Sequence, residues 1–83
     1  MTAPAWLAQR GGTVKLGSDG NNWYVVLNDQ PSYRLTAVPA GGKFSCAIRQ
    51  TNNGKRIESQ GIFPTADEAI QAGLEDLRKA LGW

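Results

Sequence analysis

The chain is most informative in residues 42–81, GKFSCAIRQTNNGKRIESQGIFPTADEAIQAGLEDLRKAL, where two strands, a turn and a helix follow one another. Apolar and polar side chains alternate from Lys43 to Gln50, which is the period of a β-strand with one buried face. The inward face comprises Phe44, Cys46 and Ile48, and the outward face comprises Ser45, Ala47 and Arg49. The run Asn52-Asn53-Gly54 predicts a type I′ hairpin turn, because Asn and Gly accept the two positive φ values that this turn requires. Residues 55–59 are therefore expected to return as the partner strand.

The last part of this segment has the pattern of a capped amphipathic helix. Thr65 is a favourable N-cap and Glu68 follows three residues later, which is the spacing of a capping box. Apolar residues recur at steps of three and four and predict one stripe that packs on a sheet: Ala66, Ala69, Ile70, Gly73, Leu74, Leu77 and Leu81. Because Gly73 has no side chain, we expect it to let the helix approach a bulky group such as Trp23 or Phe44. Gly82 is expected to end the helix.

Two further strands are predicted earlier in the chain, at residues 23–27 and 33–38, and residues 13–16 suit a short edge strand. Residues 28–31 are expected to end the first of these strands, and Pro39 with the glycines at 41 and 42 is expected to end the second. Together the elements predict an α+β fold, an antiparallel β-meander of three to five strands with one C-terminal helix packed on one face. We expect residues 13–83 to form this single domain and residues 1–12 to form an N-terminal tail that folds onto its core.

Length and composition limit the classes of protein to consider. With 83 residues and a mass of 8.9 kDa, the chain has the size of one small domain. Its apolar runs fall far short of the ~20 residues that cross a bilayer, and its first residues lack the pattern of a secretory signal. One cysteine, Cys46, and no histidine leave no internal disulfide and no zinc-ligand spacing. We therefore expect a cytoplasmic protein with no metal, no cofactor and no membrane partner.

The sequence predicts no catalytic residues. Without histidine, acid–base or nucleophilic chemistry would depend on Asp, Glu, Lys, Tyr or Cys. Cys46 is predicted to face the core, where a thiol behaves as a small apolar group. The acidic pairs Asp67-Glu68 and Glu75-Asp76 are neighbours on a solvated helix face and do not converge on a substrate. We therefore expect a protein that is not an enzyme.

A single helix covers only one face of the predicted sheet, so the other face is where a binding site is expected. That face is predicted to carry Tyr24, Val26, Arg34, Thr36, Val38, Ser45, Ala47, Arg49, Arg56 and Glu58. Residues 1–64 contain seven basic and three acidic side chains, 7 − 3 = +4, whereas residues 65–83 contain two basic and four acidic ones, 2 − 4 = −2. The sequence therefore predicts a basic sheet and an acidic helix, and the candidate binding residues are Tyr24, Val26, Arg34, Arg49 and Arg56.

Part of the chain, residues 42–72, carries a pattern of residues found in known DNA-binding domains. The pattern consists of Gly42-Lys43-Phe44, Ala47, Ile48, Gly54-Lys55-Arg56, Gly61, Phe63, Thr65 and Glu68-Ala69. It resembles the strand-hairpin-strand-helix unit of the plant APETALA-type domain and of the arm-binding domains of phage-type integrases. Small bacterial domains of unknown function share the same junction. The resemblance to the DNA-binding families implies that a three-stranded sheet enters the DNA major groove, with Arg49 and Arg56 as the residues that face the DNA.

Two functions remain open at this point. Apolar and small groups such as Val26, Val38 and Ala47 favour a non-enzymatic interaction module that pairs through the open sheet face with a second copy of itself or with another protein. The alternative is nucleic-acid binding, to DNA or RNA, in which arginines contact phosphates and Tyr24 lies under a base.

Overall fold

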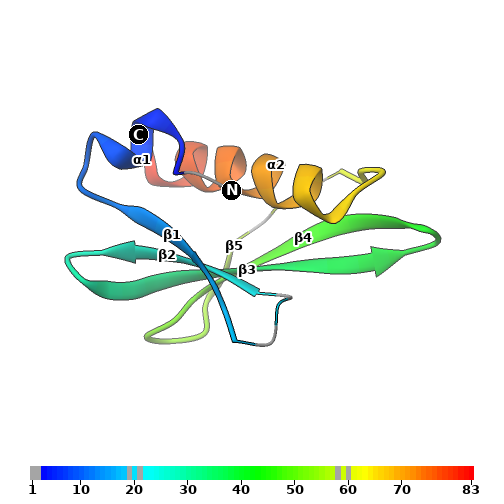
Figure 1. The fold of residues 1–83 in the computed structure, drawn as a ribbon, viewed down its shortest axis with the longest axis horizontal. Helices are drawn as coiled ribbons and strands as arrows, with labels where there is room; N and C mark the ends of the chain where they lie inside the picture. Colours follow the sequence, from blue (N-terminus) through cyan, green and yellow to red (C-terminus); the bar gives the residue numbers. More distant parts are fainter. Residues whose placement is uncertain (1–2, 19, 21, 58, 60) are drawn as a thin grey trace.

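The computed structural model describes residues 3–18, 20, 22–57, 59 and 61–83. Its elements are α1 (Ala5–Ala8), β1 (Thr13–Leu16), β2 (Asn22–Leu27), β3 (Gln30–Ala40), β4 (Lys43–Gln50), β5 (Arg56–Ile57) and α2 (Ala66–Leu81). The strands form one sheet in the order β1-β2-β3-β4-β5, and each neighbouring pair is antiparallel. Helix α2 lies across one face of the sheet, as Figure 1 shows. The predicted α+β fold, an antiparallel meander with one C-terminal helix, is confirmed.

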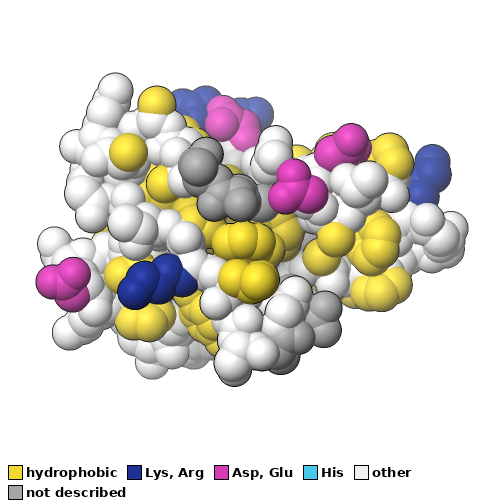
Figure 2. Space-filling model, viewed as in Figure 1, with side chains coloured by type: hydrophobic (Ala, Val, Ile, Leu, Met, Phe, Trp, Pro, Cys, Tyr) yellow, Lys and Arg dark blue, Asp and Glu magenta, His cyan; other side chains and the backbone are white. Residues whose placement is uncertain are grey.

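The core lies between α2 and the sheet. The sheet contributes Val25, Leu35, Cys46 and Ile48, and α2 contributes Ala69, Ile70, Leu74 and Leu77, all of them buried. These side chains belong to the inward positions that strand alternation and the helical stripe predict. Apolar side chains are visible between the two layers in the space-filling view of Figure 2. Burial of this kind supplies the main driving force for folding, because apolar surface leaves water.

Helix α2 begins and ends where the sequence predicts. The Oγ1 atom of Thr65 accepts a hydrogen bond from the backbone N–H of Glu68 at 3.2 Å, and Gly82 closes the helix in the left-handed region at φ 74°. The predicted neighbours of Gly73 are wrong, however. A Cβ atom at this position would overlap Sγ of Cys46 and lie 3.2 Å from Cδ2 of Leu35. The helix crosses the middle of β3 and β4, so Gly73 faces these two side chains and not Trp23 or Phe44.

Two hairpin turns differ from the sequence-based predictions. The turn after β4 is not type I′, because Gly54 has φ 69° while Asn53 is not among the residues with positive φ. Its loop spans four residues, 51–54, between Gln50 N–H and the carbonyl of Lys55, and longer loops of this kind need only one left-handed residue. The two consecutive positive φ values occur instead at Asn28 and Asp29, 52° and 62°, between β2 and β3.

Strand β3 continues through Pro39, a predicted terminator, and ends at Ala40, directly before the predicted glycines at 41 and 42. Pro39 lies opposite Phe44, and Phe44 exchanges both of its backbone hydrogen bonds with Phe63 on its other side. The N–H group that proline lacks is therefore not needed at this pair. Strand β5 is shorter than predicted and ends at Ile57. The predicted place of Glu58 on the open face lies outside the described residues.

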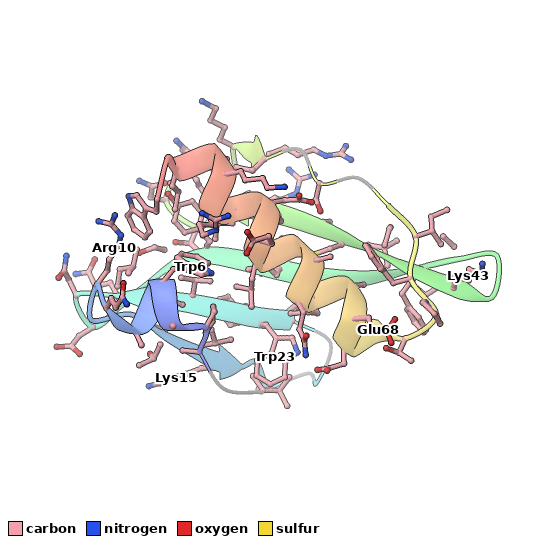
Figure 3. All side chains as sticks on the ribbon, turned by 90° about the horizontal axis from the view of Figure 1, so that it is seen from above. Trp6, Arg10, Lys15, Trp23, Lys43 and Glu68 are labelled. Atoms are coloured by element: carbon pink, nitrogen blue, oxygen red, sulfur yellow. The ribbon has the colours of Figure 1, made fainter. Side chains whose placement is uncertain are left out.

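The segment before β1 packs onto the end of α2. Leu7 in α1 is fully buried, and Trp6 contacts Trp83 with ring centroids 6.0 Å apart. The guanidinium of Arg10 lies 4.4 Å from the centre of the Trp83 ring, a cation–π contact. Figure 3 shows Trp6 and Arg10 together at one end of the molecule. These residues, which the sequence places in a tail and at the last position, are thus part of the same packed unit.

Candidate functional site

One row of side chains crosses the whole sheet on the face opposite α2. The strand register pairs Lys15 with Tyr24, Tyr24 with Arg34, Arg34 with Arg49, and Arg49 with Arg56. We call these five residues the cationic row. Their sequence neighbours Val25, Leu35 and Ile48 are buried under α2, so alternation directs the row to the other face. No helix of the described part of the chain covers that face (Figure 1).

The row presents four positive charges along a line. Lys15, Arg34, Arg49 and Arg56 are exposed, and Tyr24 is half-buried. Neighbouring strands lie about 4.8 Å apart, so four intervals give the row a length of about 19 Å. Each strand supplies one member, and the alignment therefore depends on the register of all five strands.

These cations have no carboxylate partners within the described residues, where the ion pair is Arg78 with Glu75 on α2. One guanidinium is tethered, since Nη1 of Arg49 donates to the carbonyl of Gly54 at 3.2 Å. Like charges directly opposite one another across strands are destabilising. An anion on this face would relieve that repulsion. The row therefore has the electrostatics of an anion-binding surface.

A shallow hollow of about 280 Å³ lies beside the row. It is lined by Tyr24, Arg34, Arg49, Gln50 and Thr51, so an aromatic ring, two guanidiniums and polar groups share one depression. The Tyr24 ring also rests against the turn between β1 and β2, where a Cβ atom at Gly17 would lie 2.9 Å from Cε2. The absence of a side chain at Gly17 therefore lets the ring occupy this position.

A second hollow, of about 260 Å³, shares Gln50 and Thr51 with the first. Its other lining residues are Leu27, Gln30, Pro31, Ser32, Tyr33 and Asn52. The pairing of β2 with β3 shifts here from Val25–Tyr33 to Val26–Pro31, which leaves Ser32 as an extra residue on β3. Such a bulge bends a strand and redirects its side chains. The two hollows thus adjoin at Gln50 and Thr51, along the side of the row and between its two ends.

Among the described residues, the open face beyond the row carries small or uncharged groups until Lys43, which pairs with Ala40 at the β3–β4 tip. The pairs nearer the β3–β4 tip are Asn22–Thr36, Thr36–Ala47 and Val38–Ser45. The Thr36 hydroxyl donates to Oδ1 of Asn22. Positive charge is therefore concentrated in the cationic row and not spread over the face.

The predicted site residues fall into two groups. Tyr24, Arg34, Arg49 and Arg56 come together in the cationic row, whereas Val26 lies beside it, opposite Pro31. Lys15 is a member of the row that the sequence did not single out. Its place on residues 13–16, an expected edge strand, was the available signal, but only the register aligns it with Tyr24.

Lys43 is at the distal tip of the β3–β4 hairpin in Figure 3, away from Trp6 and Arg10, and it pairs with Ala40. It is therefore not a member of the row, although the sequence places it near the basic face.

Other chemistry is limited among the described residues. Cys46 is buried, and desolvation, with a smaller contribution from the charge of Asp76, raises the pKa of its thiol to about 12. Its sulfur is therefore protonated at neutral pH and shielded from reagents. In this part of the chain, Cys, Asp and Glu side chains form no group of three or more that has the arrangement of metal ligands.

No helix that the structure describes has both the length and the apolar character needed to cross a membrane. Comparison with known proteins finds no matching family model, no matching curated protein and no matching solved structure.

Proposed function

We propose that this protein binds nucleic acid through the cationic row. The observation that supports the proposal is the register that aligns Lys15, Arg34, Arg49 and Arg56 on one uncovered face with Tyr24 among them. Arg and Lys contact phosphates, and an aromatic ring among them offers a surface for a base. Nucleic acid is the common polyanion that combines both features.

The charge of the two layers supports the same partner. The acidic residues Asp67, Glu68, Glu75 and Asp76 lie on α2, the layer opposite the row. A polyanion that approaches the molecule is thus attracted to the open face and repelled by much of the helix layer. Such a field raises association rates and orients the encounter.

Pairing of this face with a second copy or another protein has weaker support. Two copies stacked face to face would bring four cations from each row close together, which is unfavourable without an anion between them. Val26→Lys adds one more charge at the margin of this face. If self-association through this face occurs, sedimentation should show a wild-type dimer that Val26→Lys converts to a folded monomer.

The proposal is tested by fluorescence anisotropy with short labelled oligonucleotides, single-stranded and duplex, over a series of salt concentrations. Arg34→Ala/Arg49→Ala should weaken binding and flatten the dependence of log K on log salt. Each phosphate contact contributes a slope of about 0.7 for a single strand, so two lost contacts should reduce it by about 1.4. Lys43→Ala/Lys79→Ala removes the same charge away from the row and should change the slope little. Equal effects of the two double variants, or no binding by the wild type at low salt, would refute the proposal.

A further inference from the structure

We infer that the ligand of the cationic row is a single strand of nucleic acid with unpaired bases, one of which stacks on Tyr24. This inference rests on the proposed function and specifies the class of nucleic acid. It differs from the major-groove docking that the resemblance to APETALA-type and integrase arm-binding domains implies. Four features support it: the width of the row, the twist of the sheet, the surroundings of Tyr24, and the two adjoining hollows.

The width of the row does not suit a major groove. Three strands span two intervals, about 10 Å, and fit a groove about 12 Å wide. The cationic row spans five strands and about 19 Å, and its outermost members, Lys15 and Arg56, are on the two edge strands. A groove that admits the central strands would leave these edge cations outside it.

The twist of the sheet favours a flexible ligand. Neighbouring strands rotate by about 20 to 25° relative to each other, so the direction of the side chains turns by roughly 80 to 100° along the row. Duplex DNA is stiff over ~150 base pairs and presents a straight, convex surface. A single strand can follow the turn and bring successive phosphates to successive cations.

Tyr24 is placed to stack on an unpaired base. Its neighbours in the row are Lys15 and Arg34, so a strand whose phosphates contact both would carry its bases past the ring. The ring lines the 280 Å³ hollow and contacts the turn at Gly17, which limits its freedom before binding. Aromatic stacking requires a base whose faces are not covered by its neighbours in a duplex.

The two hollows provide places for adjacent bases. With volumes of about 280 and 260 Å³, each hollow has room for a group of the size of a base. The amide side chains of Gln30, Gln50 and Asn52 line the second hollow, and amides hydrogen-bond to base edges. Because the hollows share Gln50, a base at Tyr24 would be followed by one at these amides.

The experiment compares three probes of equal length: a thymidine oligomer, an abasic deoxyribose-phosphate oligomer, and a duplex. We expect the thymidine oligomer to bind most tightly to the wild type. Tyr24→Ala should weaken binding of this oligomer roughly 5- to 150-fold, the range measured for loss of one base–aromatic stack. The affinity of Tyr24→Ala for the abasic oligomer should not change, and neither should the slope of log K against log salt, because no phosphate contact is removed. Tyr24→Phe keeps the ring and should bind as the wild type does.

Gly17→Ala is a second test, which keeps the Tyr24 side chain but changes its position. The added Cβ atom displaces the ring of Tyr24, so this variant should also bind the thymidine oligomer less tightly and the abasic oligomer equally well. If the wild type bound the duplex more tightly than the thymidine oligomer, the single-strand inference would be overturned, but the proposed function would stand. Equal binding of the abasic and thymidine oligomers would overturn stacking on Tyr24. Failure of all three probes to bind would overturn the proposed function itself.

Discussion

The two faces of the sheet are built from the same strands but differ in what surrounds their side chains. On β3, Leu35 is fully buried under α2, while its neighbour Arg34 is exposed on the other face. On β4, Ile48 and Arg49 repeat this contrast. On the covered face, packing against α2 requires apolar side chains, and none of the buried ones that the structure describes is charged. The open face gathers cations at a cost in repulsion that folding does not require, and this difference is why we propose it as the binding surface.

The largest expected effect is on the covered face. Leu35→Ala removes a fully buried side chain next to Gly73 and should lower the free energy of unfolding by about 2 to 5 kcal/mol. Arg34→Ala, one residue away on the open face, should change it by no more than about 0.5 kcal/mol. Urea unfolding of both variants measures the contrast. Similar losses for the two would show that the open face is also a structural surface.

The thiol of Cys46 provides a second test of the covered face. Burial raises its pKa from 9.0 to about 12, so at pH 9 the folded protein holds about 500-fold less thiolate than a thiol with the ordinary value. Alkylation by iodoacetamide at this pH should therefore be slower by about that factor than in concentrated urea.

The same pKa shift affects stability at alkaline pH. Because the folded pKa is the higher one, its contribution to stability is complete below about pH 9 and is lost as pH rises through about 12. Rapid alkylation of the native protein at pH 9 would contradict the buried position of Cys46.

The close approach of α2 to the sheet predicts a smaller effect. Gly73→Ala gains about 1 kcal/mol of helix propensity but inserts a methyl group against Cys46 and Leu35, which costs about 1 to 3 kcal/mol. We expect the free energy of unfolding, measured by thermal or urea unfolding, to fall by up to about 2 kcal/mol. The double variant Gly73→Ala/Cys46→Ala, which removes the sulfur, should recover much of this loss. No recovery would mean that another contact limits the approach.

The smallest effect on stability is expected on the open face. There the substitution should stabilise the fold, whereas those on the covered face destabilise it. Arg56→Gln removes a charge directly opposite Arg49 and should stabilise the fold by about 0.2 to 1 kcal/mol at low salt. The gain should fall as salt screens the repulsion. Lys55→Gln removes the neighbouring charge outside the row and serves as the control. A destabilised Arg56→Gln variant would mean that the cationic row carries no repulsion to relieve.

Most of the fold could be predicted because its signals are local. Alternation assigned Phe44, Cys46 and Ile48 to the inward face, and Thr65 with Gly82 marked the limits of α2. Errors arose where a backbone group depends on a distant partner. Pro39 remains within β3 because the hydrogen bonds of Phe44 go to Phe63, a pairing that the residues around Pro39 do not encode.

The candidate site was predictable only in part. Alternation puts Tyr24, Arg34, Arg49 and Arg56 on one face, but it does not say which residues of different strands lie side by side. Moving one strand by two residues would preserve every face and separate Arg34 from Arg49. Lys15 was missed for this reason, and Val26 was included although it lies beside the row.

The sequence by itself therefore determined the strands and helix α2, their faces and the separation of basic sheet from acidic helix, because these depend on spacing within short segments. Tertiary structure alone decided the register that aligns five strands into one cationic row, the contact of Gly73 with Cys46 and Leu35, and the packing of Trp6 on Trp83. Each of these joins residues that are far apart in the chain, and their positions are set by the packing of the whole core rather than by their neighbours in sequence.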